Sequence, residues 1–349
     1  MKRFKLGSKN LNIKSDSLKR LIDSSLASKS PTRALLAESA SVSLATAGKL
    51  LSALDECGFT QLEYKRGEGI GSPSKIHVFR EELSTLVLDF STPTYSASLI
   101  SGKDQKLISE HYSPDPSLSF GGNATVFLSR IGKTISPLSY YPSSICTIIA
   151  DHPESTLKIA SCASAYLPDL DDMDTVADIC VQFFGIMPAV CLTHSQAVKC
   201  ALKYNVFEPT VIGNSVSHIR LSDTLEVTHL PRHSSPAALK LDKLMINGES
   251  LSALCSKLQD VASLSLALSH LISLIDCAHE SDVIIIEYDS RRFEGIEERI
   301  SHAFRAASIS PPRIAYFDLN PQAATLGAAT AALSALIASR IQGILADKS

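Results

Sequence analysis

The hydrophobic pattern of this 349-residue chain changes at about residue 82, and this change limits the folds that the chain can adopt. Before it, apolar residues recur at helical spacing in three short segments. After it, short apolar runs alternate with helical stretches of ten or more residues, which is the pattern of an α/β fold. We therefore predict two parts, a small N-terminal domain over residues 1–82 and an α/β body over residues 83–349.

The N-terminal part has the order helix, helix, turn, helix, hairpin. We predict helices over Asp16–Ala27, Thr32–Ser39 and Ser43–Cys57, followed by extended runs over Gln61–Lys65 and Lys75–Phe79 with a glycine-rich turn between them. This is the order of a winged helix-turn-helix domain, whose third helix enters the major groove of DNA while the hairpin contacts the backbone.

Charge is divided unevenly along the chain. Residues 1–80 hold 14 Lys and Arg against 7 Asp and Glu, whereas the rest holds 19 against 29, within an overall net charge of -3. A basic module on an acidic body favours a polyanion, and we expect double-stranded DNA as the partner. Leu44 and Gly48 lie where base-reading donors would be expected, so we expect specificity to rest on Thr46, Lys49 and the hairpin. Since many winged helices do not bind DNA, a protein-binding domain remains an alternative. The candidate DNA contacts are Ser43, Thr46, Lys49, Lys65, Arg66 and Lys75.

The body begins with a predicted antiparallel meander of Ser84–Asp89, Ser96–Ile100 and Lys106–Tyr112. The longest helical run, Glu249–Cys277, is a candidate spine between two lobes. Further short strands, each leading into a helical stretch, are predicted over Ile145–Ala150, Ala189–Leu192, Val283–Glu287 and Arg313–Phe317.

Four segments carry a resemblance to a known family. They are residues 41–59, the Gly71-Ser72-Pro73 element, residues 268–293 and Leu326-Gly327-Ala328-Ala329. Together with the order of domains, they resemble the ROK family, whose members are bacterial sugar-responsive repressors and sugar kinases. The resemblance implies a winged helix followed by an actin-like ATPase (ribonuclease H-like) fold in two lobes.

The segments that handle phosphate in that family have changed here. Where the family has Asp-x-Gly-Gly-Thr, this chain has Asp89-Phe90-Ser91-Thr92-Pro93, and the second phosphate loop corresponds to Gly213–Ser217 with one glycine of three. The adenosine-site Gly-Gly corresponds to Glu287-Tyr288. The catalytic aspartate falls on His194 or near Gln196, depending on the counting. We therefore expect no catalysis and no cofactor.

Metal binding is not expected either. The family's cysteine-rich zinc element has no counterpart, and Pro231 keeps His229 and His233 off a shared helical face. Glu226-Val227-Thr228-His229 resembles the family's sugar-contacting Glu-x-Gly-His, although a hairpin of His218–Leu221 with Leu225–His229 fits the distances better. Weak candidates for ligand binding, most of them near strand ends, are Asp89, Asp151, His152, His194, Glu226 and His229.

These features predict a cytoplasmic transcriptional regulator, a homodimer or homotetramer with a sugar-like effector and no membrane partner. The eight cysteines form no CxxC pair, the N-terminus lacks the apolar core of a secretory leader, and no stretch approaches 18 apolar residues. We expect the cysteines to be free packing residues. The alternatives are a sugar kinase with residual activity and a scaffold that binds protein rather than DNA.

Overall fold

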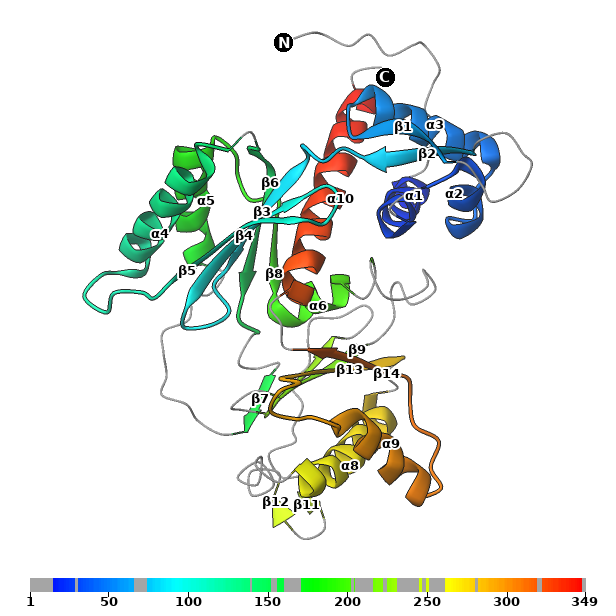
Figure 1. Cartoon of the computed structure of the whole chain (residues 1–349), viewed down its shortest axis with the longest axis vertical. Helices are drawn as coiled ribbons and strands as arrows, with labels where there is room; N and C mark the ends of the chain where they lie inside the picture. The colour runs from blue at the N-terminus through cyan, green and yellow to red at the C-terminus, as the bar shows by residue number, and fades with distance from the viewer. Residues whose placement is uncertain are drawn as a thin grey trace.

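Figure 1 shows the N-terminal domain beside one lobe of the body, with the second lobe below them. The computed structural model describes residues 15–28, 31–65, 74–138, 140–151, 156–159, 171–201, 204, 216–221, 225–230, 245–246, 249–250, 261–279, 282–318 and 322–346.

The N-terminal domain has the predicted order of elements. Thr32 and Ser43 cap the second and third helices, because each side-chain oxygen accepts a hydrogen bond from the backbone N–H three residues later. The two strands pair antiparallel over their whole length. The elements are α1 (Ser15–Ser28), α2 (Arg33–Ser39), α3 (Leu44–Glu56), β1 (Thr60–Lys65) and β2 (Ser74–Phe79).

The first lobe is a five-stranded sheet in the order β5-β4-β3-β6-β8. The predicted meander is confirmed, since β3, β4 and β5 pair antiparallel, while β3, β6 and β8 run parallel. The elements are β3 (Ser84–Asp89), β4 (Tyr95–Ser101), β5 (Lys106–Tyr112), α4 (Phe120–Ile135), β6 (Pro142–Ile149), α5 (Asp172–Phe184) and β8 (Val190–Thr193).

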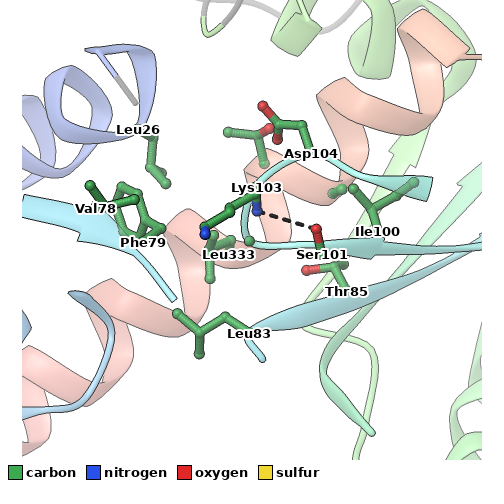
Figure 2. Close-up of a pocket in the computed structure, with 13 residues that line it drawn as sticks. Leu26, Val78, Phe79, Leu83, Thr85, Ile100, Ser101, Lys103, Asp104 and Leu333 are labelled. Carbon is green, nitrogen blue, oxygen red and sulfur yellow. Dashed lines mark hydrogen bonds between the residues drawn. The ribbon is translucent and has the colours of Figure 1, made fainter. Parts of the chain in front are cut away.

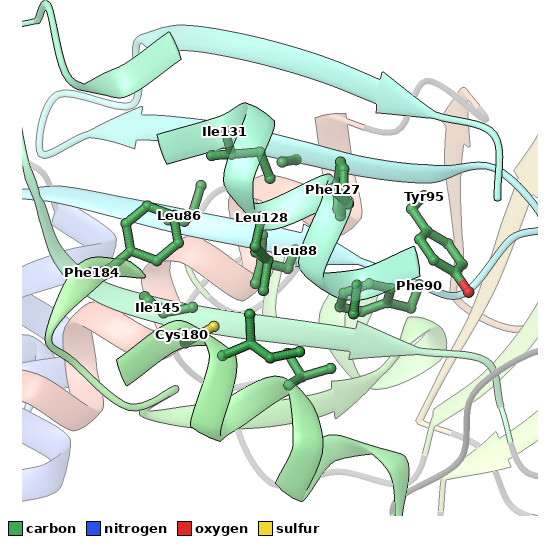
Figure 3. Packing of buried hydrophobic residues seen from close by; sticks show 14 of the residues in the cluster. Leu86, Leu88, Phe90, Tyr95, Phe127, Leu128, Ile131, Ile145, Cys180 and Phe184 are labelled. Atoms are coloured by element: carbon green, nitrogen blue, oxygen red, sulfur yellow. The ribbon is translucent and has the colours of Figure 1, made fainter. Parts of the chain in front are cut away.

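One face of this sheet packs against α4 and α5. Figure 3 shows Phe127 and Leu128 of α4 lying over Leu86 and Leu88 of β3, with Cys180 of α5 beside them. All five side chains are almost completely buried, so the burial of apolar surface stabilises this core.

The second lobe is a five-stranded sheet in the order β14-β13-β9-β10-β7, with α8 and α9 on one face. The predicted hairpin is confirmed, because β9 and β10 pair antiparallel with Leu221 opposite Leu225. Its elements are β7 (Thr156–Ile159), β9 (Val216–Leu221), β10 (Leu225–Leu230), β11 (Met245–Ile246), β12 (Glu249–Ser250), α8 (Val261–His279), β13 (Val283–Tyr288), α9 (Ile296–Ala306) and β14 (Ile314–Asp318).

The edge strand β7 corrects one prediction. The strand β6 does not lead directly into a helix, because β7 comes before α5 in the chain and joins the sheet of the second lobe by pairing with β10. The polypeptide therefore crosses from the first lobe to the second and back within one connection.

Two helices, α6 (His194–Ala201) and α10 (Gln322–Ala346), lie between the sheets. Alternation along β13 explains this layer, since Ile284 and Ile286 pack under α8 and α9 while Val283 and Ile285 face α6 and α10. A Cβ on Gly327 of α10 would lie 2.0 Å from the carbonyl oxygen of Ala197, so the glycine permits the close crossing of the two helices.

The predicted spine over Glu249–Cys277 is wrong. Glu249 belongs to the short strand β12, and α8 packs with α9 inside the second lobe. The helix that joins parts of the molecule is α10, whose alanine-rich first half lies in the interlobe core. By length and composition, Ala323–Gly343 could also cross a membrane, but it contributes to two hydrophobic cores, as a core helix does.

The second half of α10 completes the core of the N-terminal domain. Leu333, Ile337 and Ile341 pack among the buried leucines of the three N-terminal helices. In the same place the Tyr204 hydroxyl donates to the buried carboxylate of Asp23 at 2.8 Å. The domain boundary at residue 82 stays a prediction. One hydrophobic core includes residues from both sides of it.

The connection between the two parts is tight. A Cβ on Gly102, in the turn between β4 and β5, would lie 2.2 Å from the carbonyl oxygen of Arg80, so this turn presses against the connecting backbone. Six cysteines are described, and all are free as expected, but Cys277 is exposed and is not a packing residue.

Candidate functional site

The exposed face of α3 is the first candidate site. Lys49 is exposed on it, and Leu44 at its start is 55% exposed. The Ser43 oxygen accepts from the Thr46 N–H at 3.1 Å and lies 2.8 Å from the Thr46 hydroxyl, so both predicted contact residues also cap the helix. The positively polarised end of α3 is therefore formed by small polar groups.

Arg33, which the sequence analysis did not select, lies across this face. Its Nε donates to the carbonyl oxygen of Leu44 at 2.7 Å, and a Cβ on Gly48 would lie 2.9 Å from the same Nε. Gly48 is therefore half-buried beneath an exposed guanidinium group. Gly48 therefore makes room for the guanidinium group of Arg33, which comes from the neighbouring helix.

Among the described residues, the hairpin carries an exposed lysine. Lys75 on β2 is exposed and lies opposite Tyr64, which is 62% exposed. Lys65 ends β1, but its side chain lies outside the described part of the structure, as does the whole of Arg66.

The second candidate site is a buried polar cluster between the lobes. The parallel strands β3, β6 and β8 end at the same edge of the first sheet, where they bring together Asp89, Asp151 and His194. From the second lobe, β9 and β13 contribute the side chains that face the first lobe. We use the name interlobe cluster for Asp89, Ser91, Asp151, His194, Ser195, His218, Arg220 and Glu287.

One chain of contacts in the interlobe cluster starts at Asp89. The Ser91 hydroxyl donates to the Asp89 carboxylate at 2.6 Å and lies 3.5 Å from Nδ1 of His194. The Nε2 of His194 is 2.9 Å from the Glu287 carboxylate. His194 and Glu287 are 4% and 1% exposed, so this ion pair is removed from water.

A second chain of contacts repeats this order of residue types. The Ser195 hydroxyl donates to Asp151 at 2.6 Å and lies 2.7 Å from Nδ1 of His218. Nε2 of His218 is 3.3 Å from the same Glu287 oxygen that His194 contacts. The two imidazole rings are nearly parallel, with centroids 6.1 Å apart.

Hydrogen-bond accounting assigns protons within the cluster. The Ser91 hydroxyl donates to Asp89, so it must accept from Nδ1 of His194, whose Nε2 then donates to Glu287. His194 is therefore the cationic partner of Glu287. Arg220 lies 3.8 Å from the same carboxylate, and Nε2 of His218 lies 3.3 Å from it.

Ionisation of the central pair follows from these contacts. Burial acts to lower the pKa of His194, but the charge of Glu287 and the hydrogen bond to it outweigh that effect and raise the pKa. Burial acts to raise the pKa of Glu287, but His194 and His218 hold it well below its ordinary value. Each group of this pair therefore stabilises the charged form of the other.

The chemistry of this cluster favours structure over attack on a substrate. Ser195 and His218 have the residue types of a nucleophile and a base, yet Ser195 is completely buried and its proton is directed to Asp151. The cluster instead holds groups of one lobe to groups of the other. Within the described residues, no group of His, Cys, Asp and Glu has the geometry of a metal site.

The structure brings together only part of the predicted ligand set. Asp89, Asp151 and His194 meet in the interlobe cluster, and Glu226 and His229 lie on β10, with side chains that are not described. His152 lies outside the described residues. Ser91, Ser195, His218 and Arg220 were not among the predicted site residues, and Glu287 was considered only as a replacement for the family's adenosine-site glycine. A carboxylate in the apolar strand β13 was the available signal, because buried carboxylates are paired.

Comparison with solved structures establishes the predicted fold. A ROK family transcriptional regulator, described as a homolog of the E. coli MLC protein, matches with a TM-score of 0.59 and 13% identity over 95% of this chain and 98% of its own. A likeness at this identity concerns the fold, which is the ROK type in two lobes. No family model matches the chain, and no curated protein matches it.

Two other solved structures match less of the chain. A Streptococcus pneumoniae ROK family protein in complex with sucrose has a TM-score of 0.46 and 8% identity over 75% of this chain and 99% of its own. A ROK family glucokinase from Streptomyces griseus, in complex with glucose and AMPPNP, has a TM-score of 0.45 and 12% identity over 72% of this chain and 99% of its own.

Proposed function

We propose that the protein is a transcriptional regulator of the ROK family, a repressor that binds double-stranded DNA through α3 and the hairpin. The observation that carries the proposal is the exposed surface of α3, where Arg33 lies over Gly48 beside the exposed Lys49. A guanidinium fork fixed in this way can donate two hydrogen bonds to a guanine edge in the major groove. The regulator that matches 95% of the chain supports the same function.

In this proposal, the body regulates and does not catalyse. The interlobe cluster occupies strand ends that face the other lobe, and its carboxylates are already bound by serines, histidines and Arg220. Phosphoryl transfer requires a carboxylate that is free to receive the proton of the sugar hydroxyl. We therefore assign the body to assembly, as a homodimer or homotetramer in the cytoplasm, and to binding a sugar-like effector.

The test is binding of the full-length protein to its own upstream DNA at rising salt concentration. Lys49→Ala should reduce the slope of log affinity against log salt by about 1, because one phosphate contact is lost. Arg33→Ala should weaken binding by about 1–3 kcal/mol and relax the preference at one base pair. The matched control is Arg299→Ala, an exposed arginine on α9.

Two results would contradict the proposal. Wild-type binding without a salt slope would remove the electrostatic basis of DNA recognition. Equal effects of Arg33→Ala and Arg299→Ala would show that the α3 surface has no special part in it. For the body, ATP-dependent phosphorylation in a coupled assay across common hexoses would exclude the non-catalytic assignment.

A further inference from the structure

A separate cavity of about 200 Å³ lies where the N-terminal domain meets the first lobe. Its lining residues come from α1, β2, β3, β4, the turn between β4 and β5, and α10, so both parts of the molecule contribute (Figure 2). None of them belongs to the interlobe cluster or to the α3 surface. The cavity therefore calls for an explanation of its own.

Most of its wall is apolar. Leu26 and Phe79 come from the N-terminal domain, and Ile100 and Leu333 come from the body. All four are less than 10% exposed, so they enclose the cavity rather than form an open patch. Two hydroxyls in the wall already have partners, since Thr330 donates to the Leu326 carbonyl oxygen and Thr85 pairs with Ser144.

Lys103 supplies the positive charge of the wall, and its neighbour Asp104 adds one carboxylate. Its amine is 3.6 Å from the Glu81 carboxylate, which is longer than a hydrogen bond, and both side chains are more than a third exposed. The other Glu81 oxygen accepts from the Tyr140 hydroxyl at 3.2 Å. Figure 2 shows the Lys103 side chain extending from the turn toward Phe79 and Leu333. An exposed ion pair of this length contributes little, so another anion can replace Glu81.

We propose that this cavity binds a small carboxylic acid with a compact apolar body. The apolar wall takes the hydrocarbon part, and the Lys103 amine takes the carboxylate. A volume of about 200 Å³ lies below the range of roughly 300–1,000 Å³ for drug-sized ligands, so the acid has a short branched chain or a single ring.

Such a ligand contacts both parts of the molecule at once. Because it touches Leu26 and Phe79 on one side and Ile100 and Leu333 on the other, its binding depends on how the N-terminal domain sits on the body. An effect on DNA affinity rests on the proposed function, whereas binding of the acid does not, and the experiment measures the two separately.

The experiment is titration calorimetry of the full-length protein with isovalerate, hexanoate and benzoate, each compared with its uncharged amide. At least one acid should bind, and its amide should bind about tenfold more weakly or not at all, because a charge-assisted hydrogen bond is lost. Lys103→Met, which keeps the apolar stem, should weaken the acid to the same degree. The matched control is Lys106→Met, an exposed lysine outside the cavity.

Leu333→Phe fills the cavity and should abolish binding of the acid. If the Leu333→Phe protein does not fold, Lys103→Met still tests the site. The proposal is overturned if none of the three acids releases or absorbs heat up to about 10 mM, well above a millimolar dissociation constant. It is also overturned if an amide binds as tightly as its acid, or if Lys106→Met weakens binding as much as Lys103→Met. Acid binding that leaves DNA affinity unchanged would uphold the site and separate it from regulation.

Discussion

Glu287 is the carboxylate that both histidines of the interlobe cluster approach. It interrupts the apolar strand β13 and is 1% exposed, which by itself calls for a cationic partner. Its partner His194 is 93 positions away in the chain, and no local pattern identifies such a pair. Gly48 is similar, because the Arg33 side chain that covers it comes from another helix.

Replacing Glu287 by Gln should destabilise the body by about 3–5 kcal/mol, because His194 would stay buried without its counter-charge. Urea unfolding at pH 6 measures the change. Glu298→Gln, an exposed glutamate on α9, should stay within about 0.5 kcal/mol of wild type. A Glu287→Gln protein as stable as that control would mean that the cluster does not hold the lobes together.

The same pair predicts a pH dependence. His194 has a raised pKa, so its contribution is complete below its ordinary value of 6.5 and is lost as the pH rises through the raised value. Glu287 has a lowered pKa, so its contribution is present above 4.5 and is lost as the pH falls through the lowered value. The melting temperatures of wild type and His194→Gln should therefore differ most at about pH 5–6.5 and converge in alkali. A difference that does not shrink as the pH rises above 6.5 into alkali would contradict this assignment.

At the scale of elements, the sequence was informative where one face of a segment is buried. The N-terminal helices and the meander follow simple periodicities, and their bounds agree closely with the structure. The helix α10 is apolar on several sides because it packs against α6, the first sheet and the N-terminal helices. Without a polar face it gives no periodic signal, which explains why the spine was assigned to the wrong helix.

Two glycines of α10 give a matched test of its packing. Gly327→Ala would place a Cβ 2.0 Å from the Ala197 carbonyl oxygen and 2.5 Å from the Ala201 nitrogen, and should destabilise by about 1–3 kcal/mol or more. Gly343→Ala has open space around it and should stabilise the helix by about 0.5–1 kcal/mol. Thermal unfolding of both variants measures the difference, and a stable Gly327→Ala protein would refute the close crossing.

At the scale of the molecule, α10 joins the interlobe core to the core of the N-terminal domain. Ala328 and Ala332 lie in the first core, and Leu333, Ile337 and Ile341 lie in the second. A displacement of one lobe against the other would therefore move a helix on which the N-terminal domain is built. Sequence alone places this helix some 300 residues from α1 and gives no sign of the contact.

The shared core can be tested through Ile337. Ile337→Ala removes a completely buried side chain and should cost about 2–5 kcal/mol. Hydrogen exchange should accelerate in α1 although the substitution lies at the other end of the chain. Ile309→Ala, at a position that is 50% exposed, is the control. Unchanged protection of α1 in the Ile337→Ala protein would separate the two cores.

The buried ion pair of His194 and Glu287 also restricts how such a chain can evolve. Replacing either Glu287 or His194 to make room for a phosphate would leave the other member of the pair buried without its counter-charge. Each such first step toward a nucleotide cleft would cost stability before any activity is gained, and a marginal protein tolerates only a few kcal/mol of loss. Several coordinated changes would be needed at once to open a nucleotide cleft here.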